Sequence, residues 1–260
     1  MIDIDIIRNY FPEPLRSSAS FDKHLLKEYL QLMILDFISS SEYASGLCFI
    51  GGTNLRLIQK IDRFSEDLDF DCKDMTKEDF MGLTDKVVSF LRRNGLNVET
   101  RDKDNPKLTA FRRNLYFPHL LFDMNLTGHA DERFLIKIEA QDQGISYKPE
   151  IADVRGCGFF FPIQVPPKGV LCSMKISALL SRAKGRDFYD TMFLLSQTAP
   201  DYAFLKGKTG IGSLPELKQA VNELMSRTNM ISKAKDFEHL LFNSRNSTKI
   251  LRFADFIDSL

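Results

Sequence analysis

A short apolar strand that runs directly into two glycines and a hydroxyl residue limits the possible folds of this chain more than any other feature. Residues 46–52, GLCFIGG, predict a buried strand that ends in a turn. Residues 53–61 predict the helix that follows, with Thr53 or Asn54 as its cap. Glycine permits positive φ angles, and the first free amides of a helix face whatever occupies the turn before it. The turn is therefore a candidate anion site, although many such turns are only tight connections.

An acidic strand follows this helix. Residues 66–72, EDLDFDC, alternate with period two, so Asp67 and Asp69 project from one face with Cα atoms about 7 Å apart. Leu68 and Phe70 point the other way into a core. Two carboxylates held so close repel each other unless a cation lies between them, and Mg²⁺ takes oxygen ligands that substrate phosphates often complete. The alternative is an exposed edge strand with solvated acids.

Two further acids are candidates for the same site. Glu139 lies in the stretch LIKIEAQ, where period two places Lys137 and Glu139 on the face opposite the isoleucines. A third carboxylate would allow the site to hold two divalent ions roughly 3.5–4 Å apart. Asp123 is a lower-ranked candidate for the same role. The alternative for Glu139 is a surface acid that pairs with Lys137 or Arg133.

The hydrophobic pattern changes near residue 165 and predicts two domains. Residues 21–40 predict a helix with one buried stripe, and residues 116–128 and 132–143 predict two antiparallel strands. After a segment with three prolines, the pattern is helical to the end of the sequence. We therefore predict a mixed α/β domain with an N-terminal helix over residues 1–165 and a helical domain over residues 166–260.

Composition excludes some classes of protein but selects none. The 260 residues include 35 Lys and Arg and 35 Asp and Glu, so any basic surface must be local. No stretch approaches the roughly 18 apolar residues that a spanning helix needs, and the N-terminus does not resemble a signal peptide. We expect a cytoplasmic protein without membrane association. The four cysteines form no C-x-x-C pair, so neither a zinc site nor a disulfide framework is indicated.

Together these motifs resemble a known family. The stretches GGTNLRL, RFSEDLDFD, IKIEA and KISALLSRAKGRDFYD are similar to those of the AbiEii/AbiGii toxin family of nucleotidyltransferases. That family includes MenT-like toxins of bacterial toxin–antitoxin and abortive-infection systems. The resemblance covers about residues 47–195 and implies an α+β fold. The expected architecture is a nucleotidyltransferase (polymerase beta-like) mixed sheet flanked by helices, followed by a C-terminal helical domain.

The resemblance assigns roles to individual residues. The implied metal ligands are Asp67, Asp69 and Glu139. The implied catalytic set adds Lys175 and Asp190 to these three acids. The nucleotide-binding candidates are Gly51, Gly52, Thr53, Arg56, Ser65, Lys175, Arg182, Arg186 and Asp187. Lys175 and Arg182 are seven residues apart on one predicted helix face, where they could meet a triphosphate together. An intrahelical salt bridge between Arg186 and Asp190 is the alternative for that pair.

The implied function is a metal-dependent transfer of a nucleotide from an NTP, with Mg²⁺ or Mn²⁺ as cofactor and pyrophosphate as the leaving group. The resemblance implies a growth-inhibiting toxin that a cognate antitoxin neutralises, and tRNA or another RNA as the first acceptor to consider. Two alternatives stay open on the residues alone. One is a two-metal nuclease, against which the phosphate-gripping turn argues, and the other is a non-catalytic Mg-NTP-binding regulatory protein.

Overall fold

The structure is a computed structural model that describes residues 2–102 and 109–260, and it contains two compact units. The first, here called the α/β unit, comprises Met1–Gln59, Phe64–Gly144 and Glu150–Val165. The second, the helical unit, comprises Lys60–Arg63, Ile145–Pro149 and Pro166–Leu260. The helical unit thus takes four residues from the connection between the glycine turn and the acidic strand.

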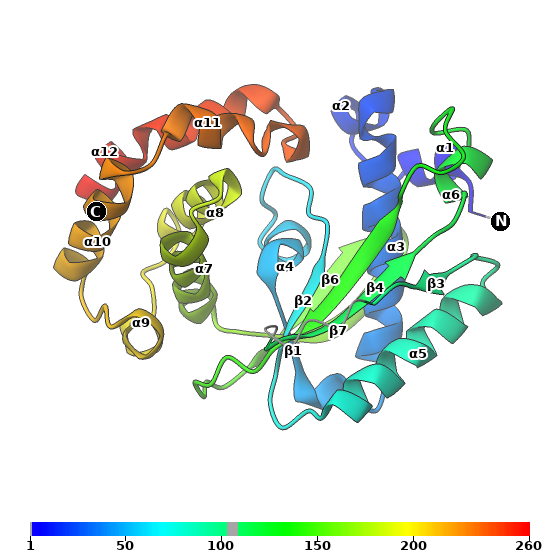
Figure 1. Ribbon diagram of the computed structural model, residues 1–260, viewed down its shortest axis with the longest axis horizontal. Coiled ribbons are helices and arrows are strands. Elements are labelled where there is room, and N and C mark those ends of the chain that lie inside the picture. Colours follow the sequence, from blue (N-terminus) through cyan, green and yellow to red (C-terminus); the bar gives the residue numbers. More distant parts are fainter. Residues whose placement is uncertain (1, 103–108) are drawn as a thin grey trace. The chain divides into compact units, whose positions relative to one another are not determined.

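A five-stranded mixed sheet forms the centre of the α/β unit (Figure 1), which confirms the predicted fold class. Its strand order is β1-β2-β5-β4-β3. The strands are β1 (Leu47–Ile50), β2 (Leu68–Cys72), β3 (Glu99–Thr100), β4 (Phe111–Tyr116) and β5 (Leu135–Ala140). Only β2 and β5 pair in parallel; the other neighbours are antiparallel. A separate antiparallel hairpin consists of β6 (Glu150–Gly156) and β7 (Phe159–Val165).

Helices cover this sheet and supply its core. They are α1 (Ile4–Arg8), α2 (Glu13–Arg16), α3 (Asp22–Ser39), α4 (Gly51–Leu57), α5 (Lys77–Arg93) and α6 (Leu120–Asp123), with short 3₁₀ turns at Ala19–Phe21 and Ala44–Gly46. The long helix α3 lies where the sequence predicted it, but its burial is not confined to one stripe: all residues from Leu30 to Leu35 are buried. A capping box of Thr76 and Asp79 begins α5, which packs on α3 and β4.

The structure corrects two predictions of secondary structure. Residues 116–128 do not form a strand, because Pro118 has no N–H for the ladder and His119 adopts a φ of 59°, which turns the chain into α6. The strand before it, β4, was not predicted because its sequence, FRRNLY, has two arginines and an asparagine at its centre. The helix after the glycines begins at Gly51 rather than at residue 53. Its N-terminus has no side-chain cap, so the predicted caps Thr53 and Asn54 are wrong.

The helical unit contains the remaining helices. These are α7 (Lys168–Arg182), α8 (Gly185–Leu195), α9 (Tyr202–Thr209), α10 (Leu214–Ser226), α11 (Met230–Lys235) and α12 (Phe253–Asp258), with 3₁₀ segments Glu238–Leu240 and Ser244–Arg252. Side chains of Asp201, Ser213 and Asn229 cap three of them at their N-termini. The strong local signals explain why the sequence predicted this part of the chain as helical.

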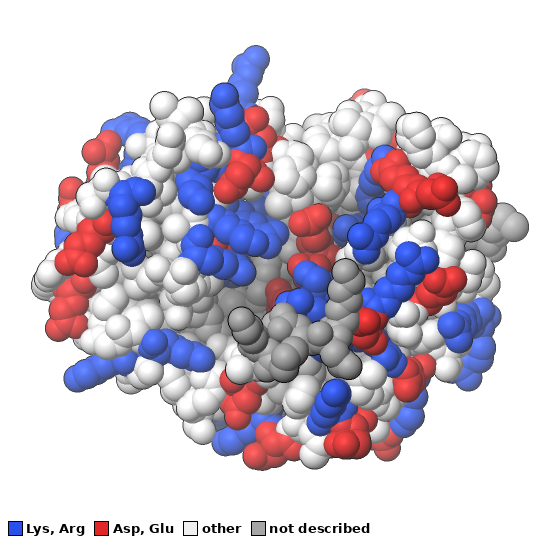
Figure 2. All heavy atoms as spheres, viewed as in Figure 1, with Lys and Arg blue, Asp and Glu red and all other residues white. Residues whose placement is uncertain are grey.

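The two predicted domains differ in charge. Residues 166–260 contain 14 Lys and Arg and 9 Asp and Glu, whereas residues 1–165 contain 21 and 26. On the face shown in Figure 2, several Lys and Arg side chains gather close to where Figure 1 places α7 and α8. The zero net charge of the chain therefore combines a basic helical part with an acidic α/β part. Among the described residues, no helix is both long and apolar enough to cross a membrane.

Candidate functional site

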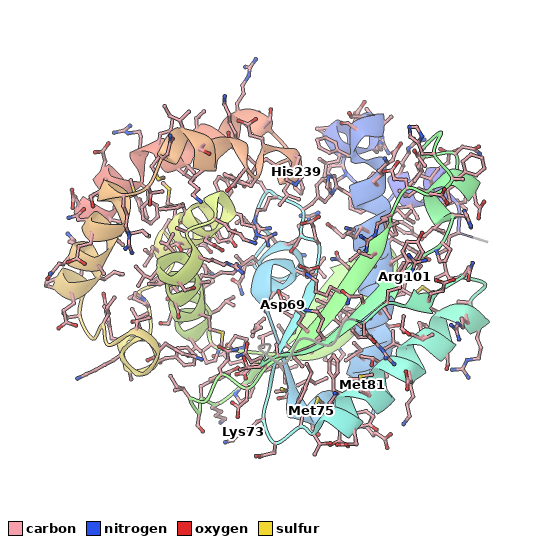
Figure 3. All side chains as sticks on the ribbon, in the orientation of Figure 1. Asp69, Lys73, Met75, Met81, Arg101 and His239 are labelled. Carbon is pink, nitrogen blue, oxygen red and sulfur yellow. The ribbon has the colours of Figure 1, made fainter. Side chains whose placement is uncertain are left out.

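The glycine turn and the acidic strand are in direct contact. Gly51 has a φ of 80°, and a Cβ placed on it would lie 2.1 Å from Oδ2 of Asp69. No other residue fits there, because a side chain would be strained by the backbone and would occupy the space of the Asp69 carboxylate. Figure 3 labels Asp69 beside α4, in agreement with this contact. The turn thus sets the position of one of the predicted metal ligands.

Replacing Gly51 with Ala is expected to displace the Asp69 carboxylate and to reduce the nucleotide transfer that the sequence resemblance implies by a factor on the order of 10 to 100. Gly95 offers a matched control, because it has a φ of 81° but no atom within 4 Å of an added Cβ. Gly95→Ala should therefore show only the backbone strain of about 1 kcal/mol in urea unfolding, without loss of transfer. Equal transfer rates in the two variants would contradict the role assigned to the contact.

Strand register brings the predicted acids together on one face of the sheet. Asp69 on β2 lies directly opposite Glu139 on the parallel neighbour β5. Asp67 immediately precedes β2, and its main-chain carbonyl accepts a 2.5 Å hydrogen bond from the buried Thr53 hydroxyl. Burial alternates along β5, so Lys137 and Glu139 lie on the half-exposed face, as the sequence predicted. The three carboxylates and the glycine turn therefore belong to one local arrangement within the α/β unit.

Two cations contact the carboxylates of Asp67 and Glu139. Nζ of Lys137 lies 3.1 Å from Oδ2 of Asp67 and 3.6 Å from Oε1 of Glu139. Arg112, which is opposite Glu139 in the β4–β5 ladder, places Nε 2.7 Å from the same Glu139 oxygen. The sequence indicated Lys137 as a partner of Glu139 but missed Arg112, because β4 was not recognised as a neighbour of this strand.

The donor set suits a hard divalent cation in its chemistry. In the part of the chain that the structure describes, no three His, Cys, Asp or Glu side chains already surround a metal position. The Lys137 ammonium instead lies between the carboxylates of Asp67 and Glu139, where a positive charge is needed. Carboxylate oxygens are ligands that Mg²⁺ accepts, and the register pair Asp69–Glu139 places two of them side by side.

Other residues predicted around the turn are engaged within the protein. Arg56 on α4 makes a bidentate ion pair with Glu28 on α3, at 2.8 and 3.0 Å. Ser65 accepts a 3.2 Å hydrogen bond from Nε2 of Gln31 through its main-chain carbonyl. These contacts tie the residues between the turn and the acidic strand to α3.

Two further acids of the α/β unit have different surroundings. Asp71, the third acid of the alternating strand, is 9% exposed and accepts a hydrogen bond from the Gln143 amide at 2.9 Å. It therefore stabilises the chain after β5. Asp123 is exposed on the short helix α6, rather than on a strand as predicted.

Sequence reasoning missed Lys27, a lysine of α3 that lies near the acids. Its Nζ is 3.9 Å from Oε1 of Glu66 and 5.5 Å from the centre of the Phe134 ring. Burial lowers the pKa of Lys27 below its ordinary value, while the charges of Glu66 and Asp67 oppose that shift. The only sequence signal was a lysine directly after the buried pair of leucines on this helix.

The helical unit contains the second group of predicted residues around a fully buried carboxylate. Asp190 on α8 accepts hydrogen bonds from Nε and one terminal nitrogen of Arg63, both at 2.7 Å, and from Nζ of Lys175 at 2.8 Å. Burial by itself would raise the pKa of Asp190, but Arg63 and Lys175 together lower it to about 2. The carboxylate is therefore ionised and shared between a guanidinium and an ammonium.

Arg63 was not predicted, although it is 1% exposed and lies four residues before Asp67. Its neighbour Asp62 accepts hydrogen bonds from the Tyr189 hydroxyl at 2.7 Å and from Nδ2 of Asn246 at 2.8 Å. Burial and the Asp62 contact raise the pKa of Tyr189. The available sequence signal was the charged pair Asp62–Arg63 between α4 and β2. The hydrogen-bond partners of Asp62 are 127 and 184 residues away in the chain.

A second ion pair joins the end of α7 to the start of α8. Asp187 is fully buried and accepts two hydrogen bonds from the Arg182 guanidinium, at 2.9 and 2.7 Å. It also accepts the Lys184 amide at 3.1 Å, so it caps α8. Lys175 and Arg182 thus bind two different carboxylates of α8. Arg186 is half-buried on the first turn of the same helix.

A sequence family matches most of this arrangement. Residues 34–208 match the family described as "Nucleotidyl transferase AbiEii toxin, Type IV TA system". The matched range covers more than half of the chain. It includes the glycine turn, the three acids of the α/β unit, and the Lys175–Asp190 pair of the helical unit.

Solved structures with the same fold have low sequence identity. MenT4, a nucleotidyltransferase toxin from Mycobacterium tuberculosis H37Rv, is 16% identical with a TM-score of 0.62; the alignment covers 100% of this chain and 91% of MenT4. JHP933 from Helicobacter pylori is 18% identical with a TM-score of 0.54, over 91% and 92% of the two chains. No match was found among curated protein sequences.

Proposed function

This chain belongs to the AbiEii family of nucleotidyl transferase toxins and is a nucleotidyltransferase, and we propose that Asp67, Asp69 and Glu139 form its catalytic centre. One observation carries the proposal: Asp69 is in register with Glu139 and packs against the glycine that begins α4. Carboxylates at one spot beside a turn with free amides suit the transfer of a nucleotidyl group, because that reaction needs metal ligands and phosphate contacts together.

These three acids would hold Mg²⁺ or Mn²⁺. A bound divalent cation would supply charge neutralisation for the phosphates and would activate the attacking oxygen. The protein itself contributes position: Thr53 fixes the Asp67 carbonyl, and the contact with Gly51 fixes the Asp69 carboxylate. The amides of Gly51, Gly52 and Thr53 would bind phosphate oxygens of the NTP.

We assign Lys175 to the triphosphate as counter-charge, with Asp190 as the residue that positions it. The Lys175 ammonium donates one hydrogen bond to Asp190 and none to any other described residue, so donor positions remain for a phosphate oxygen. Arg63 satisfies both carboxylate oxygens of Asp190. We retain Arg182, Arg186 and Asp187 as further residues that act on the nucleotide or orient one another.

We further propose RNA, and tRNA first, as the acceptor of the nucleotide. The excess of Lys and Arg in residues 166–260, and their grouping near α7 and α8 in Figure 2, would suit a phosphate backbone. Ser181–Arg186, with the sequence SRAKGR, is the most basic local stretch there. As the family is one of toxins, we also propose that a cognate antitoxin neutralises the activity.

Incubation with total tRNA, Mg²⁺ and each α-labelled NTP in turn tests the proposal. We expect one NTP to label RNA, and we expect the Asp67→Ala, Asp69→Ala double variant to give no label. Parallel reactions with ribosomal RNA distinguish a tRNA acceptor from RNA in general. Shortening of the RNA without incorporation would favour the nuclease alternative, and NTP binding without either reaction would favour a regulatory binding protein.

A further inference from the structure

Lys27 is a largely buried lysine with one long ion pair. Its side chain is 17% exposed, and its closest charged neighbour is Glu66, whose Oε1 is 3.9 Å from Nζ. None of the described residues accepts a hydrogen bond from its ammonium group, which has three donors. The Lys27 Nζ lies 5.5 Å from the centre of the Phe134 ring, so one side of the ammonium faces an aromatic ring. A charged group in this situation is available to a ligand.

Lys23, on the same helix, is an example of a lysine with a structural ion pair. It lies one turn before Lys27, is 42% exposed, and donates a 2.5 Å hydrogen bond to Glu132. Lys27 has neither that exposure nor such a partner. The pKa of Lys27 is lowered because burial destabilises its charged form more than the negative charges of Glu66 and Asp67 stabilise it.

The location of Lys27 indicates what it binds. Glu66, whose Oε1 is 3.9 Å from the Lys27 Nζ, directly precedes Asp67, so the ammonium lies close to the acid cluster of Asp67, Asp69 and Glu139. Lys137 and Arg112 already bind the Asp67 and Glu139 carboxylates at 3.1 and 2.7 Å. These two carboxylates therefore already have cationic partners, and we expect a different anion as the ligand of Lys27. A phosphate group brings several strong acceptor oxygens with negative charge and needs no metal to attract an ammonium.

We propose that Lys27 binds a phosphate oxygen of the nucleoside triphosphate at the acid cluster, as a catalytic residue supplied by α3. This proposal rests on the proposed function, because it assigns the ligand of the same centre. Lys27 lies before residues 34–208, which the family match covers. The ammonium would neutralise charge that develops on the phosphate during transfer, in addition to Lys175.

Replacing Lys27 with Met tests this role, because stability and ligand binding should change in opposite directions. Met keeps most of the apolar stem and removes the desolvated charge. We expect the melting temperature of the free protein to stay equal or to rise by about 2–4 °C. Binding of inorganic tripolyphosphate in the presence of Mg²⁺, measured by calorimetry, should weaken by about tenfold. Lys27→Arg should restore part of that binding.

Lys23→Met is the matched control and should bind tripolyphosphate as the wild type does. Unchanged binding by Lys27→Met, or a melting temperature below that of Lys23→Met, would overturn the proposal, since Lys27 would then be dispensable or structural. If wild-type protein transfers nucleotide and Lys27→Met does so equally well, only the role of Lys27 fails. If tripolyphosphate binding depends on Lys27 but no NTP is transferred, the phosphate contact stands and the proposed function fails. Absence of tripolyphosphate binding in the wild type would overturn both.

Discussion

Asp69→Asn is expected to reduce nucleotide transfer on the order of 10³-fold while leaving the fold intact. Asn has the same shape as Asp, so the contact with Gly51 is retained, but the amide cannot supply the negative charge that a divalent cation requires. Removing one of the neighbouring acids also relieves repulsion with Glu139, so the melting temperature should not fall. Initial rates with α-labelled NTP, together with thermal unfolding, measure both effects.

Asp123→Asn is the control for this experiment. Asp123 is an acid of the same unit, exposed on α6, and lies outside the β2–β5 register pair. Its amide variant should transfer nucleotide at the wild-type rate. If Asp69→Asn kept more than about a tenth of the activity, or Asp123→Asn lost as much as Asp69→Asn, the assignment of the catalytic centre would be wrong.

Asp190→Ala is expected to lower the free energy of unfolding by about 3–5 kcal/mol, because it leaves two buried cations without their carboxylate. Arg63 is 1% exposed and Lys175 is 7% exposed, so neither can recover its hydration without disrupting the helical unit. Urea unfolding followed by circular dichroism measures the loss. Lys175→Met is the informative companion, since Asp190 keeps its bidentate contact with Arg63. That variant should stay folded and lose transfer, whereas an equal destabilisation of both variants would contradict this division of roles.

The same carboxylate predicts how stability depends on pH. The pKa of Asp190 is about 2 in the folded protein, below the ordinary value of 3.8 that applies to the unfolded chain. The folded protein therefore protonates this carboxylate less readily than the unfolded chain does. Its contribution to stability is therefore complete above about pH 4 and is lost as the pH falls towards 2. Unfolding free energies measured between pH 2 and 6 should show this loss in the wild type. A wild-type profile that is flat between pH 4 and 2 would contradict it.

The sequence predicted the parts of the site that depend on local rules. Glycine chemistry identified the turn, and period two placed Asp67 and Asp69 on one face and Glu139 on a strand face with Lys137. Those rules need only neighbouring residues, whereas the strand register that places Asp69 opposite Glu139 is known only from the structure. What the turn binds is not settled by local rules, and it remains a prediction.

The remaining contacts join residues that are far apart in the chain. Arg63 binds a carboxylate 127 residues later in the chain. Arg112 contacts Glu139 across the β4–β5 ladder, and the sequence did not predict β4 because of its charged residues. Lys27 is one of several polar residues on α3, and only the folded structure shows that it is largely buried with one long ion pair to Glu66. Pairings of this kind depend on tertiary packing, which no local pattern of residues encodes.

Parallel reactions with α-labelled and γ-labelled NTP test the central claim most directly. The reactions contain total tRNA and Mg²⁺, use each NTP in turn, and compare the wild type with the Asp67→Ala, Asp69→Ala variant. If the three acids catalyse nucleotide transfer, the α-label enters RNA, the γ-label leaves as pyrophosphate, and the variant does neither. Incorporation of the γ-label, or α-labelling that survives in the variant, would contradict this account of the site.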